Sequence, residues 1–167
     1  MNGSSQYFID KLNLQRHPEG GYFSETYRSQ ETVLAEALPE PFHGDRNIST
    51  AIYFLLEGDQ FSAFHRIKSD EVWHFYFGIP LNVYIIHPNG ELVVMKIGNP
   101  LDEDCNFQGV VKAGCWFASK PINTEGFSLV GCTVAPGFDF EDFKLAGPEL
   151  ARQFPQHSEL ISKLIRC

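Results

Sequence analysis

The stretch FHRIKSDEVWHFYFG (64–78) decides how this chain is expected to fold. It holds two short runs rich in aromatic and apolar residues, joined by a polar turn, which is typical of two antiparallel strands. Side chains alternate along a strand, so His65 shares a face with Ile67, and Glu71 shares a face with Trp73. If both faces point inward, an imidazole and a carboxylate meet inside an apolar cavity.

Further apolar runs of strand length lie on both sides of this stretch, with turn residues between them. Asn89-Gly90 is the strongest hairpin signal, because both residues tolerate a positive φ. None of the gaps has room for a helix, which excludes βαβ units and predicts an all-β sandwich or closed barrel. The runs are STAIYFLLE (49–57), QFSAFHRI (60–67), EVWHFYF (71–77), PLNVYIIH (80–87), ELVVMKIG (91–98), CWFASK (115–120) and FSLVGCTVA (127–135).

The two ends of the chain have a different pattern. A short N-terminal helix is expected, capped by Ser4 or Ser5, followed by a strand at 22–28. Residues 29–48 contain prolines, glycines and charges and are expected to form a long surface loop. A helical tail is expected at 146–167, because apolar residues recur there at helical spacing.

The composition fits a single domain over residues 1–167, with a barrel core at about 20–143. The net charge is −8 and the 13 Lys and Arg residues are scattered, which argues against nucleic acid and anionic membranes as partners. The N-terminus lacks the pattern of a secretory signal, and apolar runs such as AIYFLL (51–56) are too short to span a bilayer. A cytoplasmic location is therefore expected.

The four cysteines, Cys105, Cys115, Cys132 and Cys167, form no CxxC pair. We expect them to be buried thiols in a reducing compartment. A shared zinc site or a redox pair is the alternative.

The spacing of His65, Glu71 and Gly78 resembles the first motif of the cupin superfamily, G-x5-H-x-H-x(3,4)-E-x6-G. The second histidine of that motif is replaced by Ile67. In the second cupin motif, Phe117 stands at the position of the histidine. The chain therefore keeps half of the metal-binding signature.

Longer blocks resemble one branch of that superfamily, the family-five cupins, long catalogued as a domain of unknown function. The resemblance implies a double-stranded β-helix, or jelly-roll barrel, with short N-terminal and C-terminal helices, and a homodimer. It implies no particular activity. The blocks are HPEGGYFSETYRS (17–29), AIYFLL (51–56), FHRIKSDEVWHFYFG (64–78), AGCWFA (113–118) and SLVGCTVAPGFDFEDF (128–143).

The two replaced ligands argue against a metal cofactor. A cupin metal centre uses three histidines and one glutamate, and neither Ile67 nor Phe117 has a lone pair to offer. Two protein ligands rarely hold a divalent ion tightly. No cofactor is predicted, with a divalent metal and a metal-dependent cupin oxygenase as the remaining alternative.

The His65 and Glu71 pair has a second interpretation. Some cupins, such as the deoxysugar 3,5-epimerases, work without a metal and use a histidine base, an orienting carboxylate and a tyrosine acid. By this resemblance His65 is the candidate base and Glu71 the carboxylate, with Tyr22, Tyr53 or Tyr84 as the acid. The hypothesis is an isomerase- or epimerase-like enzyme acting on a small polar or sugar-like ligand. The alternative is a non-catalytic small-molecule-binding protein.

Other conspicuous side chains complete the expectations. The phenylalanines of APGFDFEDF (135–143) are expected to cover the barrel or a dimer interface, and the alternative is an acidic lip that binds a ligand. Four histidines are expected at the surface, namely His17, His43, His87 and His157. Residues that could contact a ligand in the cavity are Tyr22, Glu25, Tyr53, Trp73 and Trp116. The family resemblance also singles out Glu19 in HPEGG (17–21), which forms either part of the cavity mouth or a plain turn before an edge strand.

Overall fold

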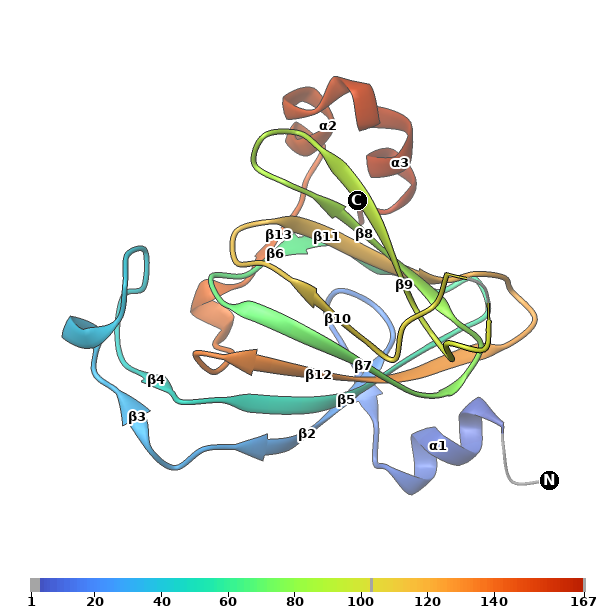
Figure 1. The fold of residues 1–167 in the computed structure, drawn as a ribbon, viewed down its shortest axis with the longest axis horizontal. Coiled ribbons are helices and arrows are strands. Elements are labelled where there is room, and N and C mark those ends of the chain that lie inside the picture. The colour runs from blue at the N-terminus through green and yellow to red at the C-terminus, as the bar shows by residue number, and fades with distance from the viewer. Residues whose placement is uncertain (1–3, 103, 167) are drawn as a thin grey trace.

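Two antiparallel β-sheets pack face to face in the computed structural model, which describes residues 4–102 and 104–166 (Figure 1). The six-stranded sheet has the order β1 (Gln15–Arg16), β2 (Tyr22–Arg28), β5 (Thr50–Glu57), β12 (Phe127–Ala135), β7 (Asp70–Gly78), β10 (Gln108–Val111). The five-stranded sheet has the order β13 (Lys144–Leu145), β6 (Ser62–Arg66), β11 (Trp116–Pro121), β8 (Leu81–Ile86), β9 (Leu92–Ile97). This arrangement confirms the predicted jelly-roll barrel.

The main hydrophobic core fills the space between the sheets. Phe54, Trp73 and Val130 extend into it from the six-stranded sheet. Val83 and Phe117 meet them from the five-stranded sheet. Each such side chain is at most 1% exposed, and full burial of a large apolar side chain contributes about 1.5–3 kcal/mol. The two inner faces therefore hold the barrel together.

The short helices predicted near both termini are present, and they cover the outer faces of the two sheets. Helix α1 (Ser5–Lys11) begins after Ser4, whose hydroxyl accepts a hydrogen bond from the Tyr7 amide, and it packs on the six-stranded sheet. Helices α2 (Glu149–Gln153) and α3 (Ser158–Lys163), with the short 3-10 turn η3 (Pro155–His157) between them, cover the five-stranded sheet (Figure 1). In the described part of the chain, no helix is long and apolar enough to cross a bilayer.

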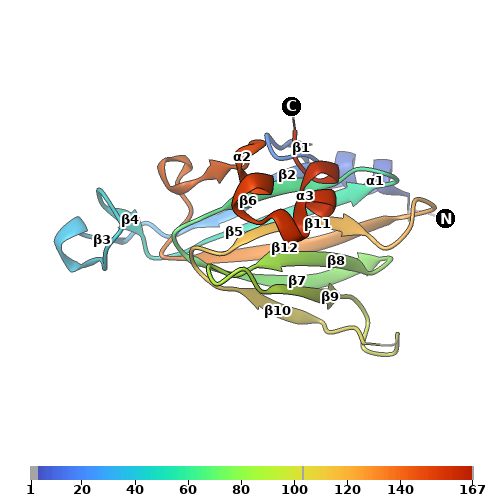
Figure 2. The same ribbon diagram turned by 90° about the horizontal axis from the view of Figure 1, so that it is seen from above.

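The segment at 29–48 corrects one expectation. It is not a plain loop, because β3 (Thr32–Val33) pairs with β4 (Arg46–Asn47) and a 3-10 turn, η1 (Ala35–Ala37), lies between them. This segment projects from the barrel in both views (Figures 1 and 2). Strand β10 was also missed, because it is only four residues long and pairs with β7 alone within its sheet.

Two glycines behave as their sequence context predicts. Gly90 has a φ of +86° in the turn that joins β8 to β9, which confirms the hairpin at Asn89-Gly90. Gly78 has a φ of +97°, and a Cβ at this position would collide with the carbonyl oxygen of Phe127. The glycine that ends the first motif is therefore required by backbone geometry.

Three of the four cysteines lie in the described residues, where Cys105, Cys115 and Cys132 are buried and form no disulfide. This confirms the expectation of buried thiols for these three. Cys167 lies outside the described residues.

A buried ion pair anchors the segment that follows β12. Both oxygens of Asp142, which ends the 3-10 turn η2 (Phe140–Asp142), accept hydrogen bonds from Arg46, at 2.7 and 2.8 Å. The Lys68 ammonium lies 3.1 Å from the same carboxylate. Burial raises the pKa of Asp142, but the hydrogen bonds from Arg46 and Lys68 outweigh burial, so this pKa lies below its usual range.

We expect Asp142→Asn to lower the free energy of unfolding at neutral pH by about 3–5 kcal/mol, because Arg46 then stays buried without its counter-charge. Because the folded-state pKa of Asp142 is lowered, its contribution is present above about pH 4 and is lost as the pH falls through that pKa. Urea denaturation at several pH values measures both effects. Glu141→Gln is the matched control, because Glu141 is 73% exposed and 3.5 Å from Arg46, and it should cost less than about 1 kcal/mol. Equal losses in the two variants would contradict the proposed anchor.

Candidate functional site

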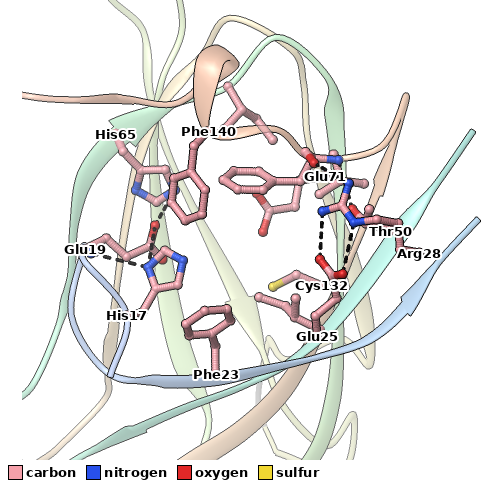
Figure 3. A pocket seen from close by; sticks show the side chains of 14 residues that line it. His17, Glu19, Phe23, Glu25, Arg28, Thr50, His65, Glu71, Cys132 and Phe140 are labelled. Atoms are coloured by element: carbon pink, nitrogen blue, oxygen red, sulfur yellow. Dashed lines mark hydrogen bonds and ion pairs between the residues drawn. The ribbon is translucent and has the colours of Figure 1, made fainter. Parts of the chain in front are cut away.

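A cavity opens between the two sheets, where the HPEGG loop (17–21) and the segment after β12 meet (Figure 3). A volume of about 80 Å³ inside it is open to water-sized molecules. Drug-sized ligand sites enclose about 300–1,000 Å³, so the occupant is small. The lining residues are His17, Glu19, Phe23, Glu25, Arg28, Thr50, Ile52, His65, Ile67, Glu71, Cys132, Val134, Phe138 and Phe140.

His65 lies in the wall formed by β6 and is 3% exposed. Its Nδ1 is 2.7 Å from the carbonyl oxygen of Ala63. Because a carbonyl only accepts, Nδ1 carries a proton, and in the neutral ring Nε2 has a free lone pair. The rings of Phe117 and Phe143 lie 4.1 and 5.3 Å from the imidazole, centroid to centroid. His65 is therefore a buried imidazole of known tautomer when neutral.

Glu19 is the carboxylic group that contacts His65, with 3.2 Å between Glu19 Oε2 and His65 Nε2. Its other oxygen accepts a hydrogen bond of 2.8 Å from the Ser62 hydroxyl. The tight turn through Gly20 and Gly21, with φ values of +115° and +76°, directs Glu19 into the barrel. The family resemblance singled out Glu19 without a contact to His65, and the two glycines after it indicate a turn that needs positive φ.

His17 corrects another expectation, because its side chain is 7% exposed and lines the cavity instead of the surface. The backbone amide of Glu19 donates a hydrogen bond to His17 Nδ1, at 3.3 Å. The ring also packs edge-on against Phe23, with centroids 4.6 Å apart. Since Nδ1 accepts, neutral His17 carries its proton on Nε2.

Burial favours the neutral forms of His17, Glu19 and His65. Desolvation lowers the pKa of His17 and of His65, and it raises the pKa of Glu19. The hydrogen bonds agree, because neutral His65 can only accept at Nε2. The matching state of Glu19 is a carboxylic acid that donates to His65. The contact thus holds one proton between two groups.

Glu71 faces this pair from the other sheet, since it belongs to β7 while His65 belongs to β6. It is 8% exposed, and its carboxylate accepts a hydrogen bond from the Cys132 thiol. Burial raises the pKa of Glu71 to about 7, against a smaller opposing effect of His65. The two residues predicted to meet in the cavity both line it, but the carboxyl group that contacts His65 is Glu19.

Glu25 and Arg28 form a bidentate ion pair at the cavity wall, with distances of 3.0 and 2.8 Å. A β-bulge between Glu25 and Tyr27 shifts the alternation of β2, which brings Arg28 to the face of Glu25. Arg28 also donates to Asn47 Oδ1 and to the carbonyl oxygen of Phe138. Its guanidinium is thereby fixed by protein partners.

Four of the predicted ligand contacts lie elsewhere. Tyr22 and Tyr53 point away from the barrel and pack near α1, because their neighbours Phe23 and Phe54 point inward. For the same reason Trp116, next to the inward Phe117, packs under the C-terminal helices. Trp73 points inward but belongs to the main core. No tyrosine is placed to act as the acid, since Tyr84 packs against the hydrophobic cluster that contains Trp116 and the cavity lining contains no tyrosine among the described residues.

The donor atoms present do not fit a cupin metal centre. Ile67 lines the cavity and Phe117 lies against His65, at the two positions where histidines are needed. Among residues 4–102 and 104–166, no three His, Cys, Asp or Glu side chains are grouped so that they could hold a metal ion. The oxygens of Glu19 are already used by Ser62 and His65.

Comparisons with known proteins agree with this fold. The family model described as Cupin superfamily (DUF985) matches residues 6–146. An uncharacterized protein of Saccharomyces cerevisiae, YML079W, is 33% identical, covering 90% of this chain and 84% of its own. The crystal structure of protein SO0799 from Shewanella oneidensis is 40% identical, with a TM-score of 0.86 and 98% of each chain covered. A hypothetical protein from Leishmania major is 31% identical, with a TM-score of 0.87, covering 99% of this chain and all of its own.

We expect Glu71→Gln to make the protein more stable at about pH 8 and to change its stability little at about pH 4. The folded-state pKa of Glu71, about 7, is above its value of 4.5 in the unfolded chain, so wild-type stability falls as the pH rises between the two. That interval corresponds to a gain of at most about 3 kcal/mol for the variant at pH 8. Urea denaturation at the two pH values measures it. Glu91→Gln on the surface should change neither value, and a Glu71→Gln variant that is less stable at pH 8 would contradict this assignment.

Proposed function

The chain belongs to the cupin superfamily, in the family DUF985, and from this premise we propose that its cavity binds a small polar molecule and moves a proton on it without a metal. The reaction class is isomerisation or epimerisation next to a carbonyl group. The observation that carries the proposal is the placement of Glu71 and His65 on facing walls of one cavity.

Glu71 is the proposed base. A general base works best when its pKa lies near the working pH, and burial places the pKa of Glu71 at about 7. Its carboxylate takes a proton from the carbon next to the carbonyl, and the electron pair of that C–H bond moves into an enolate. The apolar side chains of Phe23, Phe138 and Phe140 line the same cavity and limit its water.

Glu19 and His65 are the proposed acid. The proton held between them is returned to the enolate, on the other face of the same carbon for an epimerisation or on the neighbouring carbon for an isomerisation. After this step Glu71 holds a proton and the Glu19–His65 pair lacks one. The pair regains its proton from Glu71 through water, or the next turnover runs in the opposite direction. His17, with its proton on Nε2, adds a donor among the lining residues for the substrate oxygen. This scheme revises the expected roles, because Glu71 replaces His65 as the base, and Glu19 with His65 replaces the tyrosine as the acid.

A non-catalytic binding protein is the second candidate function. The observation behind it is the small cavity with three phenylalanine side chains in its lining, which can hold a ligand without any reaction. The homodimer and the cytoplasmic location expected from the sequence stay predictions.

Exchange of carbon-bound hydrogen in deuterated water tests the proposal. Purified protein is incubated with ketoses from trioses to hexoses and with small amino ketones, and exchange is followed by proton NMR. We expect exchange in the wild type, with Glu71→Gln and His65→Ala slower by about 100-fold or more.

The matched control is His74→Ala, because His74 sits on β7 beside Thr133 and Gln108 and does not line the cavity. It should exchange as fast as the wild type. Exchange that is equal in all four proteins would rule out catalysis by this cavity, and its absence from every protein would leave the binding protein as the better description.

A further inference from the structure

Carboxyl groups outnumber guanidinium groups in the lining of the cavity. Three carboxyl groups line it, those of Glu19, Glu25 and Glu71, against one guanidinium. That guanidinium, on Arg28, makes four hydrogen bonds to Glu25, Asn47 and Phe138, out of five N–H groups. An anionic ligand would therefore meet carboxyl groups with no free cation among the described lining residues.

Glu71 has unused hydrogen-bonding capacity directed at the cavity. A carboxylate offers about four acceptor positions, and among the described residues only the Cys132 thiol donates to this one. The residue is 8% exposed, so bulk solvent reaches this carboxylate only through the cavity. A ligand with several N–H groups, or with a positive charge, would satisfy this carboxylate.

Aromatic side chains form another part of the wall. Phe23 lines the cavity beside His17, and Phe140 lines it from the segment after β12 (Figure 3). Phe138 of the same segment also lines it. Phe138 and Phe140 are edge to face, with centroids 5.0 Å apart and an angle of 82°. The faces of aromatic rings attract cations, and cages of such rings recognise ammonium groups.

We propose that the cavity selects a small cationic amine, a primary to quaternary ammonium compound, which places its charge on Glu71 and its carbon groups against Phe23, Phe138 and Phe140. The net charge of −8 adds a long-range attraction for such a ligand. This inference rests on the proposed function and names the substrate class of the same site. In an α-amino carbonyl compound, the carbon that bears the ammonium group also bears the acidic hydrogen, so one carboxylate can hold the charge and take the proton.

Binding of simple probes tests this charge preference without requiring any reaction. The full chain is titrated with tetramethylammonium, methylammonium, tert-butanol and acetate at about pH 8, above the pKa of Glu71, and followed by NMR. We expect tetramethylammonium to bind about tenfold more tightly than tert-butanol, its neutral counterpart in shape, and acetate not to bind. Tert-butanol or acetate binding as tightly as tetramethylammonium, or no binding by either ammonium ion, would overturn the inference.

Variants locate the bound cation. Glu71→Gln should weaken tetramethylammonium binding about tenfold, and Phe140→Ala should weaken it severalfold. Phe140 is 56% exposed, so its truncation is not expected to unfold the chain. Glu91→Gln removes a surface carboxylate outside the cavity and should leave binding unchanged. Equal loss in Glu71→Gln and Glu91→Gln would mean a general charge effect and would overturn the site.

The two hypotheses fail in different ways. Ammonium binding without hydrogen exchange removes the proposed reaction and leaves this inference standing. Exchange on neutral ketoses, with no preference for ammonium probes, removes this inference and leaves the reaction standing.

Discussion

The contact between Glu19 and His65 joins distant parts of the chain inside the barrel. Glu19 belongs to the HPEGG loop and His65 to β6, and the backbone carbonyl of Glu19 also accepts hydrogen bonds from the Ala63 amide and from Arg166 near the C-terminus. Both side chains are more than nine-tenths buried. Burying an isolated charge costs free energy, so the pair is favoured as a carboxylic acid and a neutral imidazole that share one proton. This contact therefore sets the protonation states of Glu19 and His65 together.

The two carbon side chains at the motif positions and the contact with Glu19 act on the same imidazole. At the histidine positions of the cupin motifs, Ile67 and Phe117 supply carbon instead of nitrogen, which makes the surroundings of His65 less polar. A buried imidazole still needs a partner for each ring nitrogen. Ala63 and Glu19 supply them, so both ring nitrogens of His65 are satisfied by groups of this chain.

Most features of the fold that could be predicted from the sequence follow from the alternation of side chains along strands. It gives the strands of the barrel and the inward positions of His65 and Glu71, and applied to Phe23 or Phe117 it also turns Tyr22 and Trp116 outward. Alternation could not predict where the side chains of the HPEGG loop point, because it does not apply to a turn with two glycines at positive φ. The positions of its side chains depend on tertiary hydrogen bonds to β6, which link residues more than forty positions apart.

Asp142 and Glu71 show how the same burial leads to opposite chemistry. The two residues are 7% and 8% exposed, yet the pKa of Asp142 is lowered while that of Glu71 is raised. The difference lies in their donors, because Asp142 receives Arg46 on both oxygens and lies beside Lys68, whereas Glu71 receives a thiol. A carboxylate so completely paired fixes the segment that carries Phe140 over the cavity, and it has nothing left for a ligand. Glu71 keeps its acceptor positions and a proton that can leave near neutral pH, which suits a group that binds or reacts.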